Sequence, residues 1–402
     1  MAYEKAIINK ETLAFLLSQK GVTNEYLSQK AACTVKQIVE WTNLDNDKLP
    51  TVNQARKIAE ALRVPFASLY MTLGTITPFI PTKPIIQNRR IMDADNQDDS
   101  AVNLAIIDLI QARDFYVETE ELLQREVKQF TIQINLDANV ESWANEIRNK
   151  FEIDLERQYK APSSRQFYLY LKNRIEDQGI FIQEFLGVDL DSLRAMAIYQ
   201  DSTIMPVIGI NEKDRPPAKC FSLIHELVHI TKRSSSICNA MYDNSFLKNQ
   251  EEIFCNAVSG ELLVPQIAIN TIIKNGNYDL TDLADIQRIS DKFSISREVI
   301  IRRLLDLNYI QNSDYDILSK LLHDELIASK EEQRLLKESG IQLSFSINPA
   351  QKAMDKTSMS LSKAIYAGYC EDIFTKYDVA QILSIKTKHI DKYFMEVTKW
   401  DN

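Results

Sequence analysis

A short stretch near the middle of the chain constrains the fold most, because it is apolar on every side of a helix. Residues 221–230 carry three titratable side chains, His225, Glu226 and His229, among six large apolar ones: Phe221, Leu223, Ile224, Leu227, Val228 and Ile230. A helix that is hydrophobic all round lies inside a core. We therefore expect a helix over residues 220–232 at the centre of a domain.

The spacing of these titratable residues indicates a metal site. His225 and His229 are four positions apart, so their rings share one face of the helix and can both bind a zinc ion at about 2.0–2.1 Å. Glu226 is rotated by about 100° from His225, so it cannot join the ligands but can take a proton from a water on the open metal face. This pattern is typical of zinc hydrolases. The alternative is a pair of histidines hydrogen-bonded within a core.

A catalytic zinc needs a third protein ligand, and the next predicted helix, 249–263, offers carboxylates. Glu252 and Asn256 are four positions apart and share a face, so Glu252 can bind the metal while Asn256 orients a ligand histidine. Glu251 is the neighbouring alternative. The alternative for Glu252 is an ordinary acidic residue near the N-terminus of the helix, where the helix dipole favours a negative charge.

Composition indicates a mainly α, α+β protein of two or three domains. The chain has 402 residues, 45% of them hydrophobic, but only 9 Gly and 11 Pro, which are too few for an all-β protein rich in turns. No apolar run is long enough for a membrane span, and the first ten residues do not resemble a secretory signal. The five cysteines are scattered, which indicates reduced thiols in a cytoplasmic protein.

The first 72 residues are predicted to form five short helices, with Thr34 and Thr51 as caps of the third and fourth. A short turn between the second and third helices is typical of a helix-turn-helix. Residues 1–90 contain 12 basic and 7 acidic residues, whereas the whole chain carries a net charge of −9. This excess of basic residues permits nucleic-acid binding by the N-terminal region alone.

The remaining elements follow from periodicity and from helix-breaking residues. Residues 73–100 are predicted to be a linker, and 195–199 with 205–210 a β-hairpin. Helices are expected at 101–128, 140–151, 163–178 and 280–307, a mostly helical subdomain at 311–402, and a short strand at 341–347. An aromatic cluster in that subdomain is expected to be core, and it contains Tyr366, Tyr369, Phe374 and Tyr377.

The N-terminal region resembles the phage-repressor-like (XRE) helix-turn-helix. The residues that carry the resemblance are Glu40-Trp41, Leu49-Pro50-Thr51, Gln54-Ala55, Lys57-Ile58-Ala59, Leu62 and Val64-Pro65-Phe66. The resemblance implies that the third helix, 34–42, lies in the major groove with Lys36 and Gln37 as DNA-binding residues. Acidic groups on or after this helix, such as Glu40, oppose the approach of phosphates. The alternative is a helical domain that contacts only protein.

The central residues resemble the ImmA/IrrE family of metallopeptidases. The matching residues are Phe221, His225-Glu226-Leu227, His229, Glu252, Asn256 and Glu261-Leu262-Leu263-Val264-Pro265. The resemblance implies a zincin-like core in residues 135–310 of a domain at 101–310. It implies Zn²⁺, with Mn²⁺ as the alternative, bound by His225, His229 and Glu252, and Glu226 as the general base.

The resemblance also implies a regulatory endopeptidase that cleaves a repressor or antitoxin-like protein to control stress or mobile-element genes. We expect the substrate strand to pair with the 205–210 strand as an exposed sheet edge. Tyr242 and Arg302 are candidate stabilisers of the oxyanion, or ordinary surface and packing residues. The alternative function is a DNA-binding regulator or antitoxin-like protein whose peptidase fold acts as a sensor. The oligomeric state does not follow from the sequence.

Overall fold

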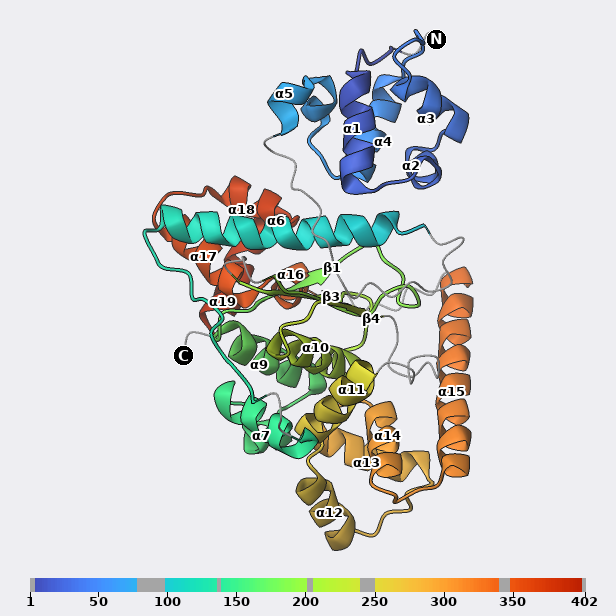
Figure 1. Cartoon of the computed structure of the whole chain (residues 1–402), viewed down its shortest axis with the longest axis vertical. Helices are drawn as coiled ribbons and strands as arrows, with labels where there is room; N and C mark the ends of the chain where they lie inside the picture. Colours follow the sequence, from blue (N-terminus) through green and yellow to red (C-terminus); the bar gives the residue numbers. More distant parts are fainter. Residues whose placement is uncertain are drawn as a thin grey trace. The chain divides into compact units, whose positions relative to one another are not determined.

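The computed structural model describes residues 4–77, 98–135, 139–200, 205–238, 250–339 and 348–399. It is mainly helical with one four-stranded sheet, which confirms the predicted α+β composition (Figure 1). The chain divides into two compact units. One contains residues 1–115 and 185–193, and the other contains residues 116–184 and 194–402.

The N-terminal unit is built of short helices, as predicted for the first 72 residues. They are α1 (Lys10–Lys20), α2 (Asn24–Ala31), α3 (Val35–Thr42), α4 (Val52–Ala61), the 3-10 helix η1 (Phe66–Tyr70) and α5 (Leu73–Ile76). Thr34 and Thr51 cap α3 and α4, as predicted, each in a capping box. The helix α5 occupies the start of the predicted linker, of which residues 78–97 lie outside the described part of the chain.

The first half of α6 (Ser100–Leu122) belongs to this same unit. The Ser100 hydroxyl accepts a hydrogen bond from the Thr23 backbone at 2.9 Å, and the Asn103 amide donates to the Gly21 carbonyl at 2.7 Å. Leu104 is fully buried with the core residues of the N-terminal helices. The division between the units therefore falls within α6, after Phe115, rather than at residue 100.

The second unit contains the central helices. They are α7 (Val140–Lys150), α8 (Leu155–Tyr159), α9 (Ser164–Glu176), α10 (Pro216–Thr231), α11 (Gln250–Leu263), α12 (Gln266–Asn275), α13 (Leu283–Phe293) and α14 (Arg297–Asp306). The single helix predicted for 280–307 is wrong. Ser294 adopts a left-handed conformation that ends α13, and the Ser296 side chain then caps α14.

The sheet contains β1 (Phe181–Phe185), β2 (Ala195–Ile198), β3 (Val207–Asn211) and β4 (Ser236–Cys238), in the order β1-β3-β2-β4. The antiparallel pairing of β2 with β3 confirms the predicted hairpin. However, β3 lies between β1 and β2, so the prediction that residues 205–210 form a sheet edge is wrong. The error arises because β1 was not recognised in the sequence; the edges of this sheet are β1 and β4.

The helix α10 lies in the centre of the second unit, as its composition predicts. It packs on β2 and β3, and α9 and α11 lie on the same side of the sheet (Figure 1). Every residue from Ala218 to Thr231 is buried. Two prolines, Pro216 and Pro217, open the helix where no backbone donor is needed.

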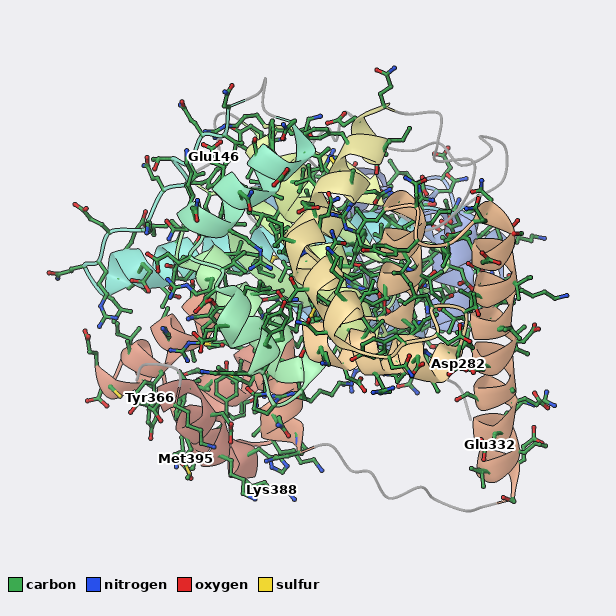
Figure 2. The ribbon with its side chains drawn as sticks, turned by 90° about the horizontal axis from the view of Figure 1, so that it is seen from below. Glu146, Asp282, Glu332, Tyr366, Lys388 and Met395 are labelled. Atoms are coloured by element: carbon green, nitrogen blue, oxygen red, sulfur yellow. The ribbon has the colours of Figure 1, made fainter. Side chains whose placement is uncertain are left out.

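The C-terminal helices are α15 (Asn312–Glu338), α16 (Pro349–Lys356), α17 (Met359–Cys370), α18 (Lys376–Ile382), the 3-10 helix η4 (Thr387–His389) and α19 (Ile390–Thr398). The Tyr366 and Tyr369 rings pack against Phe394 at centroid distances of 5.0 and 4.9 Å, which agrees with a core role. Tyr377 is 65% exposed, so it is not a core residue. Figure 2 labels Tyr366 and the exposed Met395 in this group. The predicted strand at 341–347 lies outside the described residues.

Buried polar contacts join α9 to the end of α16, the start of α17 and the residues between them. The Lys172 ammonium donates to the carbonyls of Asp355 and Thr357 at 3.0 and 2.5 Å. Arg165 forms an ion pair with the Asp355 carboxylate, and the Glu176 carboxylate accepts a hydrogen bond from the Ser360 backbone at 2.8 Å. Lys172 has no exposed surface, so the C-terminal segment provides the partners that this buried charge requires.

No single helix in the described residues is long and apolar enough to cross a membrane. By length and composition alone, α11 and α12 taken together pass that test, but they are bent by 50° relative to each other.

Candidate metal centre

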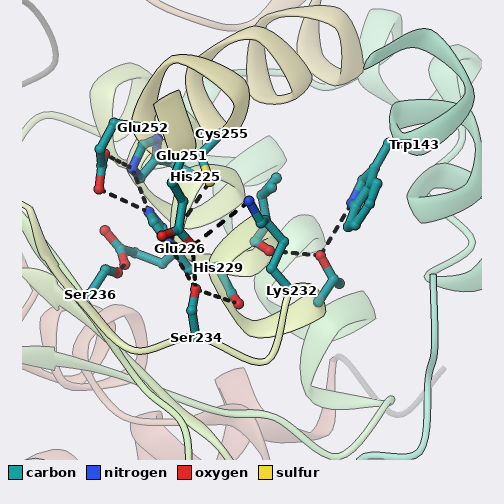
Figure 3. Close-up of polar contacts among 12 residues, drawn as sticks. Trp143, His225, Glu226, His229, Lys232, Ser234, Ser236, Glu251, Glu252 and Cys255 are labelled. Atoms are coloured by element: carbon teal, nitrogen blue, oxygen red, sulfur yellow. Dashed lines mark hydrogen bonds and ion pairs between the residues drawn. The ribbon is translucent and has the colours of Figure 1, made fainter. Parts of the chain in front are cut away.

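The two histidine side chains of α10 meet on one face of the helix. Their Nε2 atoms are 3.2 Å apart, and His225 and His229 are 6% and 1% exposed. Because they occupy consecutive turns of a buried helix, their positions depend only on the regularity of α10. The structure therefore brings the two imidazoles together as their spacing predicts (Figure 3).

Glu252, in the first turn of α11, completes a cluster of three. Its Oε2 lies 3.2 Å from His225 Nε2, and its Oε1 lies 3.4 Å from His229 Nε2. Burial alone would raise the pKa of Glu252, but hydrogen bonds and charge from both histidines hold this pKa well below its usual range. The carboxylate is thus in the ionised form that a metal ion binds.

These distances fit a tetrahedral metal site. Ligand atoms about 2.1 Å from a tetrahedral ion lie about 3.4 Å from one another, close to the 3.2–3.4 Å found here. One ligand atom from each residue, His225, His229 and Glu252, lies within 4.8 Å of the others. Two imidazole nitrogens and one carboxylate oxygen, with a fourth position left open, are the donors of catalytic zinc sites. The cluster is compatible with a divalent metal ion.

Glu226 is fully buried beside this cluster. The Ser236 hydroxyl, on β4, donates a hydrogen bond to Glu226 Oε2. The other oxygen, Oε1, is buried and has no hydrogen-bond partner among the described residues. Burial raises the pKa of Glu226, and the two nearby histidines oppose this shift. A buried carboxylate oxygen without a protein partner can accept a hydrogen bond from a water molecule in the site.

The second nitrogen of His229 contacts Ser234, which the sequence did not point to, and lies near Glu251, which the sequence offered only as an alternative metal ligand. Its Nδ1 lies 3.2 Å from Ser234 Oγ and 3.8 Å from Glu251 Oε1, and the Ser234 hydroxyl donates to Glu251 at 3.0 Å. The hydrogen bond with His229 lowers the pKa of Glu251 to about 2. Asn256, expected in this orienting role, makes no hydrogen bond to either histidine in the described part of the chain. Ser234 and Glu251 occupy that position instead.

The two candidate oxyanion stabilisers lie elsewhere or outside the described residues. Arg302, on α14, forms an ion pair with Asp306 at 3.0 Å and lies over the Tyr315 ring. None of these partners belongs to the histidine and glutamate cluster. Tyr242 falls in the segment 239–249, which the structure does not describe.

The two candidate DNA-binding residues differ in how their side chains are used. Lys36 is exposed on α3. Gln37 is part of the capping box of α3, in which its side-chain oxygen accepts a hydrogen bond from the Thr34 backbone. Further along α3, Glu40 forms an ion pair with Lys48 at 2.6 Å, which partly neutralises an acidic group on the predicted reading helix.

One sequence signal for the residues around the site was present but not recognised. Three consecutive serines, Ser234, Ser235 and Ser236, begin three positions after the last residue of the helix that carries the histidines. Two of them contact titratable groups of the site, as Figure 3 shows. Hydroxyl-rich turns are common in any protein, so the signal is informative only beside the histidine pattern.

Comparison with known families supports a hydrolytic role for this domain. Residues 175–305 match the family model Peptidase_M78, described as the IrrE N-terminal-like domain. The match spans α10 and α11 and so includes His225, Glu226, His229 and Glu252; it covers neither the N-terminal helices nor residues 311–402. No curated protein matches the chain. Residues 175–305 thus form a domain similar to metallopeptidases of the IrrE and ImmA kind.

Proposed function

We propose that the protein is a zinc-dependent peptidase in which His225, His229 and Glu252 bind the metal and Glu226 is the general base. One observation carries the proposal: three buried donor groups converge at ligand distances, and a second buried carboxylate, Glu226, lies beside them. Mn²⁺ is the alternative metal, because the same nitrogen and oxygen donors accept it.

A divalent ion held by these ligands supplies Lewis acidity, which polarises an amide carbonyl and lowers the pKa of water. The chain itself supplies the proton transfers. Glu226 takes a proton from the attacking water at Oε1, because Oε2 is engaged by Ser236. It then gives this proton to the amine nitrogen as the peptide bond breaks.

Two variants test the assignment, since they separate metal binding from chemistry. Glu226→Gln keeps the ligands, so we expect it to bind zinc as the wild type does and to lose hydrolysis. His225→Ala removes a ligand, so we expect both properties to be lost. Glu146→Gln, which removes a half-buried carboxylate paired with Lys150 on α7, is the matched control. Hydrolysis retained by Glu226→Gln would refute the assigned base.

We further propose that the substrate is a cytoplasmic repressor or antitoxin-like protein, and that its cleaved segment pairs with β4. The support for β4 is that it is an edge strand, and its first residue, Ser236, contacts Glu226. Co-expression with candidate repressors tests the substrate. A repressor that is cleaved by the wild type and stays intact with Glu226→Gln is a substrate.

The N-terminal helices are the basis of a separate proposal, that this unit binds DNA. Its support is the excess of basic residues in 1–90 and the exposed Lys36 on α3. Specific DNA binding through several phosphates decreases steeply with salt. If an operator fragment is bound in this way and no protein is ever cut, the function is that of a regulator whose peptidase fold is a sensor.

A further inference from the structure

The three serines that follow α10 each contact a different element through their hydroxyl groups. Ser234 contacts the side chains of His229, on α10, and Glu251, on α11. Ser235 contacts the backbone of Tyr199, directly after β2. Ser236 contacts Glu226. We call residues 234–236 the serine turn.

The backbone conformation at the end of α10 fixes where the serine turn begins. Arg233 is in the left-handed region, with φ of 60°, and the Ser234 backbone donates to the His229 carbonyl at 3.0 Å. The Arg233 guanidinium donates to the Tyr199 hydroxyl at 2.8 Å and stacks on the Phe130 ring. This reversal directs the chain back along the side of the helix that carries His229.

Strand pairing fixes where the serine turn ends. Ser235 Oγ accepts from the Tyr199 amide at 2.8 Å and donates to the Tyr199 carbonyl at 2.7 Å. Ser236 then pairs with Ala197 in the β2–β4 register. Directly paired residues place their side chains on the same face of a sheet, and Ala197 is buried in the core that includes α10. Ser236 therefore faces α10.

The chemistry of a hydroxyl decides what Ser234 does to His229. A serine has one proton to donate, and Ser234 has two acceptors for it: the Glu251 carboxylate at 3.0 Å and the His229 carbonyl at 3.3 Å. The charged carboxylate is the stronger acceptor, and neither choice leaves a proton for His229 Nδ1. Its contact with His229 Nδ1 is then one in which the imidazole donates and the oxygen accepts. With the proton on Nδ1, the Nε2 lone pair points toward Glu252 and the metal position.

Ser236 acts on Glu226 in a different way. Its hydroxyl occupies Oε2 and leaves the buried Oε1 as the oxygen available to a reacting water. A hydrogen bond to a charged group restrains the carboxylate more strongly than a bond between neutral groups does. Ser236 thus determines which oxygen takes the proton, but it makes no contact with the metal ligands among the described residues.

We propose that the serine turn positions the reacting groups of the site by two separable actions. Ser234, with Glu251, holds His229 in the tautomer that binds metal, and Ser236 orients Glu226 for proton transfer. This inference rests on the proposed peptidase function, but its first half concerns metal affinity alone. Ser234, Ser236 and Glu251 are positioning residues, because each acts through another side chain.

The experiment measures zinc affinity, by competition with a chelator, and turnover of a cleaved protein substrate. Ser234→Ala is expected to weaken zinc binding by about 10–100-fold, and Ser234→Thr, which keeps a hydroxyl, to restore it. Glu251→Ala should weaken binding similarly, and the double variant Ser234→Ala/Glu251→Ala no further, because the two residues act in one chain of hydrogen bonds. Ser259→Ala, which removes a buried hydroxyl whose hydrogen bond among the described residues goes to the Cys255 carbonyl, is the control.

Ser236→Ala, in contrast to Ser234→Ala, is expected to lower turnover and to leave zinc affinity unchanged. Zinc affinity and KM should stay within about twofold of wild type, whereas kcat should fall by about 10–100-fold, the loss expected for a hydrogen bond to a charged group. A purely structural role for Ser236 would instead change zinc affinity and melting temperature together with kcat.

The outcomes separate this inference from the proposed function. If Ser234→Ala binds zinc as tightly as the wild type, or Ser234→Thr fails to restore binding, the role of Ser234 is refuted. If Ser236→Ala keeps wild-type kcat, the role of Ser236 is refuted. If the wild type binds zinc and cleaves nothing while Ser234→Ala still loses affinity, the peptidase function fails but the orientation of His229 by Ser234 stands.

Discussion

A buried carboxyl group on α9, far from the metal ligands in sequence, predicts how the stability of the second unit depends on pH. Glu176 is 4% exposed, and burial raises its pKa to about 7, although Lys172 and the Ser360 backbone oppose the shift. In the unfolded chain the pKa of this group is near its ordinary value of 4.5. The folded protein therefore holds a proton on Glu176 between about pH 4.5 and 7 that the unfolded chain has already lost.

The size of the effect follows from this difference. A difference of about 2.5 pKa units, at about 1.4 kcal/mol per unit, corresponds to roughly 3–4 kcal/mol. Because the folded pKa is raised, this contribution is fully present below about pH 4.5 and is lost as the pH rises to about 7. The free energy of unfolding should thus decrease by that amount across the interval.

Glu176→Gln isolates the contribution. The amide cannot ionise, and its oxygen can still accept the hydrogen bond from the Ser360 backbone. We expect the variant to gain roughly 3–4 kcal/mol relative to the wild type between pH 4.5 and 8. Urea unfolding of both proteins with chelator present, at each pH, measures the difference, and other titrating groups such as Glu298 cancel. A difference that stays constant with pH would refute the reasoning.

Three further predictions concern metal, charge and the C-terminal helices. Removal of metal with a chelator should lower the melting temperature. Zinc at a hundred times its Kd should then raise the free energy of unfolding by about 2.7 kcal/mol. A melting temperature unaffected by zinc would contradict the metal site. Lys20→Met should stabilise the N-terminal unit by about 1–3 kcal/mol in urea unfolding, because the Lys20 ammonium is buried with no hydrogen-bond partner among the described residues. A loss of stability in this variant would show that the charge is compensated. Truncation after Ile310 should leave Lys172 without its carbonyl partners. We expect it to destabilise the second unit by about 3–5 kcal/mol in urea unfolding. An unchanged free energy of unfolding would refute this role of residues 355–357.

The parts of the site that depend on local structure could be predicted from the sequence. The position of α10 and the convergence of His225 with His229 follow from composition and helical spacing. The sequence left Glu251 and Glu252 as alternatives, because adjacent residues of a helix differ only in the direction they face. The packing of α11 against α10 brings Glu252 to both Nε2 atoms and Glu251 toward Nδ1.

The contacts that depend on non-local pairing could not be predicted. The strand β1 contains Gln183 and Glu184 side by side, so it shows no alternation of apolar and polar residues that would identify a strand. Without it, the hairpin strand β3 was expected at an edge rather than in the interior. In the same way, the role of Ser236 depends on its pairing with Ala197, which no local pattern indicates.

The place of β4 in the sheet has a consequence for how the site assembles during folding. The histidine pair forms as soon as α10 does, because it needs only contacts four positions apart. The contact of Ser236 with Glu226 requires β4 to pair with β2, and Ala197 and Ser236 are 39 positions apart with all of α10 between them. Contacts between residues so far apart in the sequence form slowly. A folding chain therefore brings His225 and His229 together before Ser236 reaches Glu226.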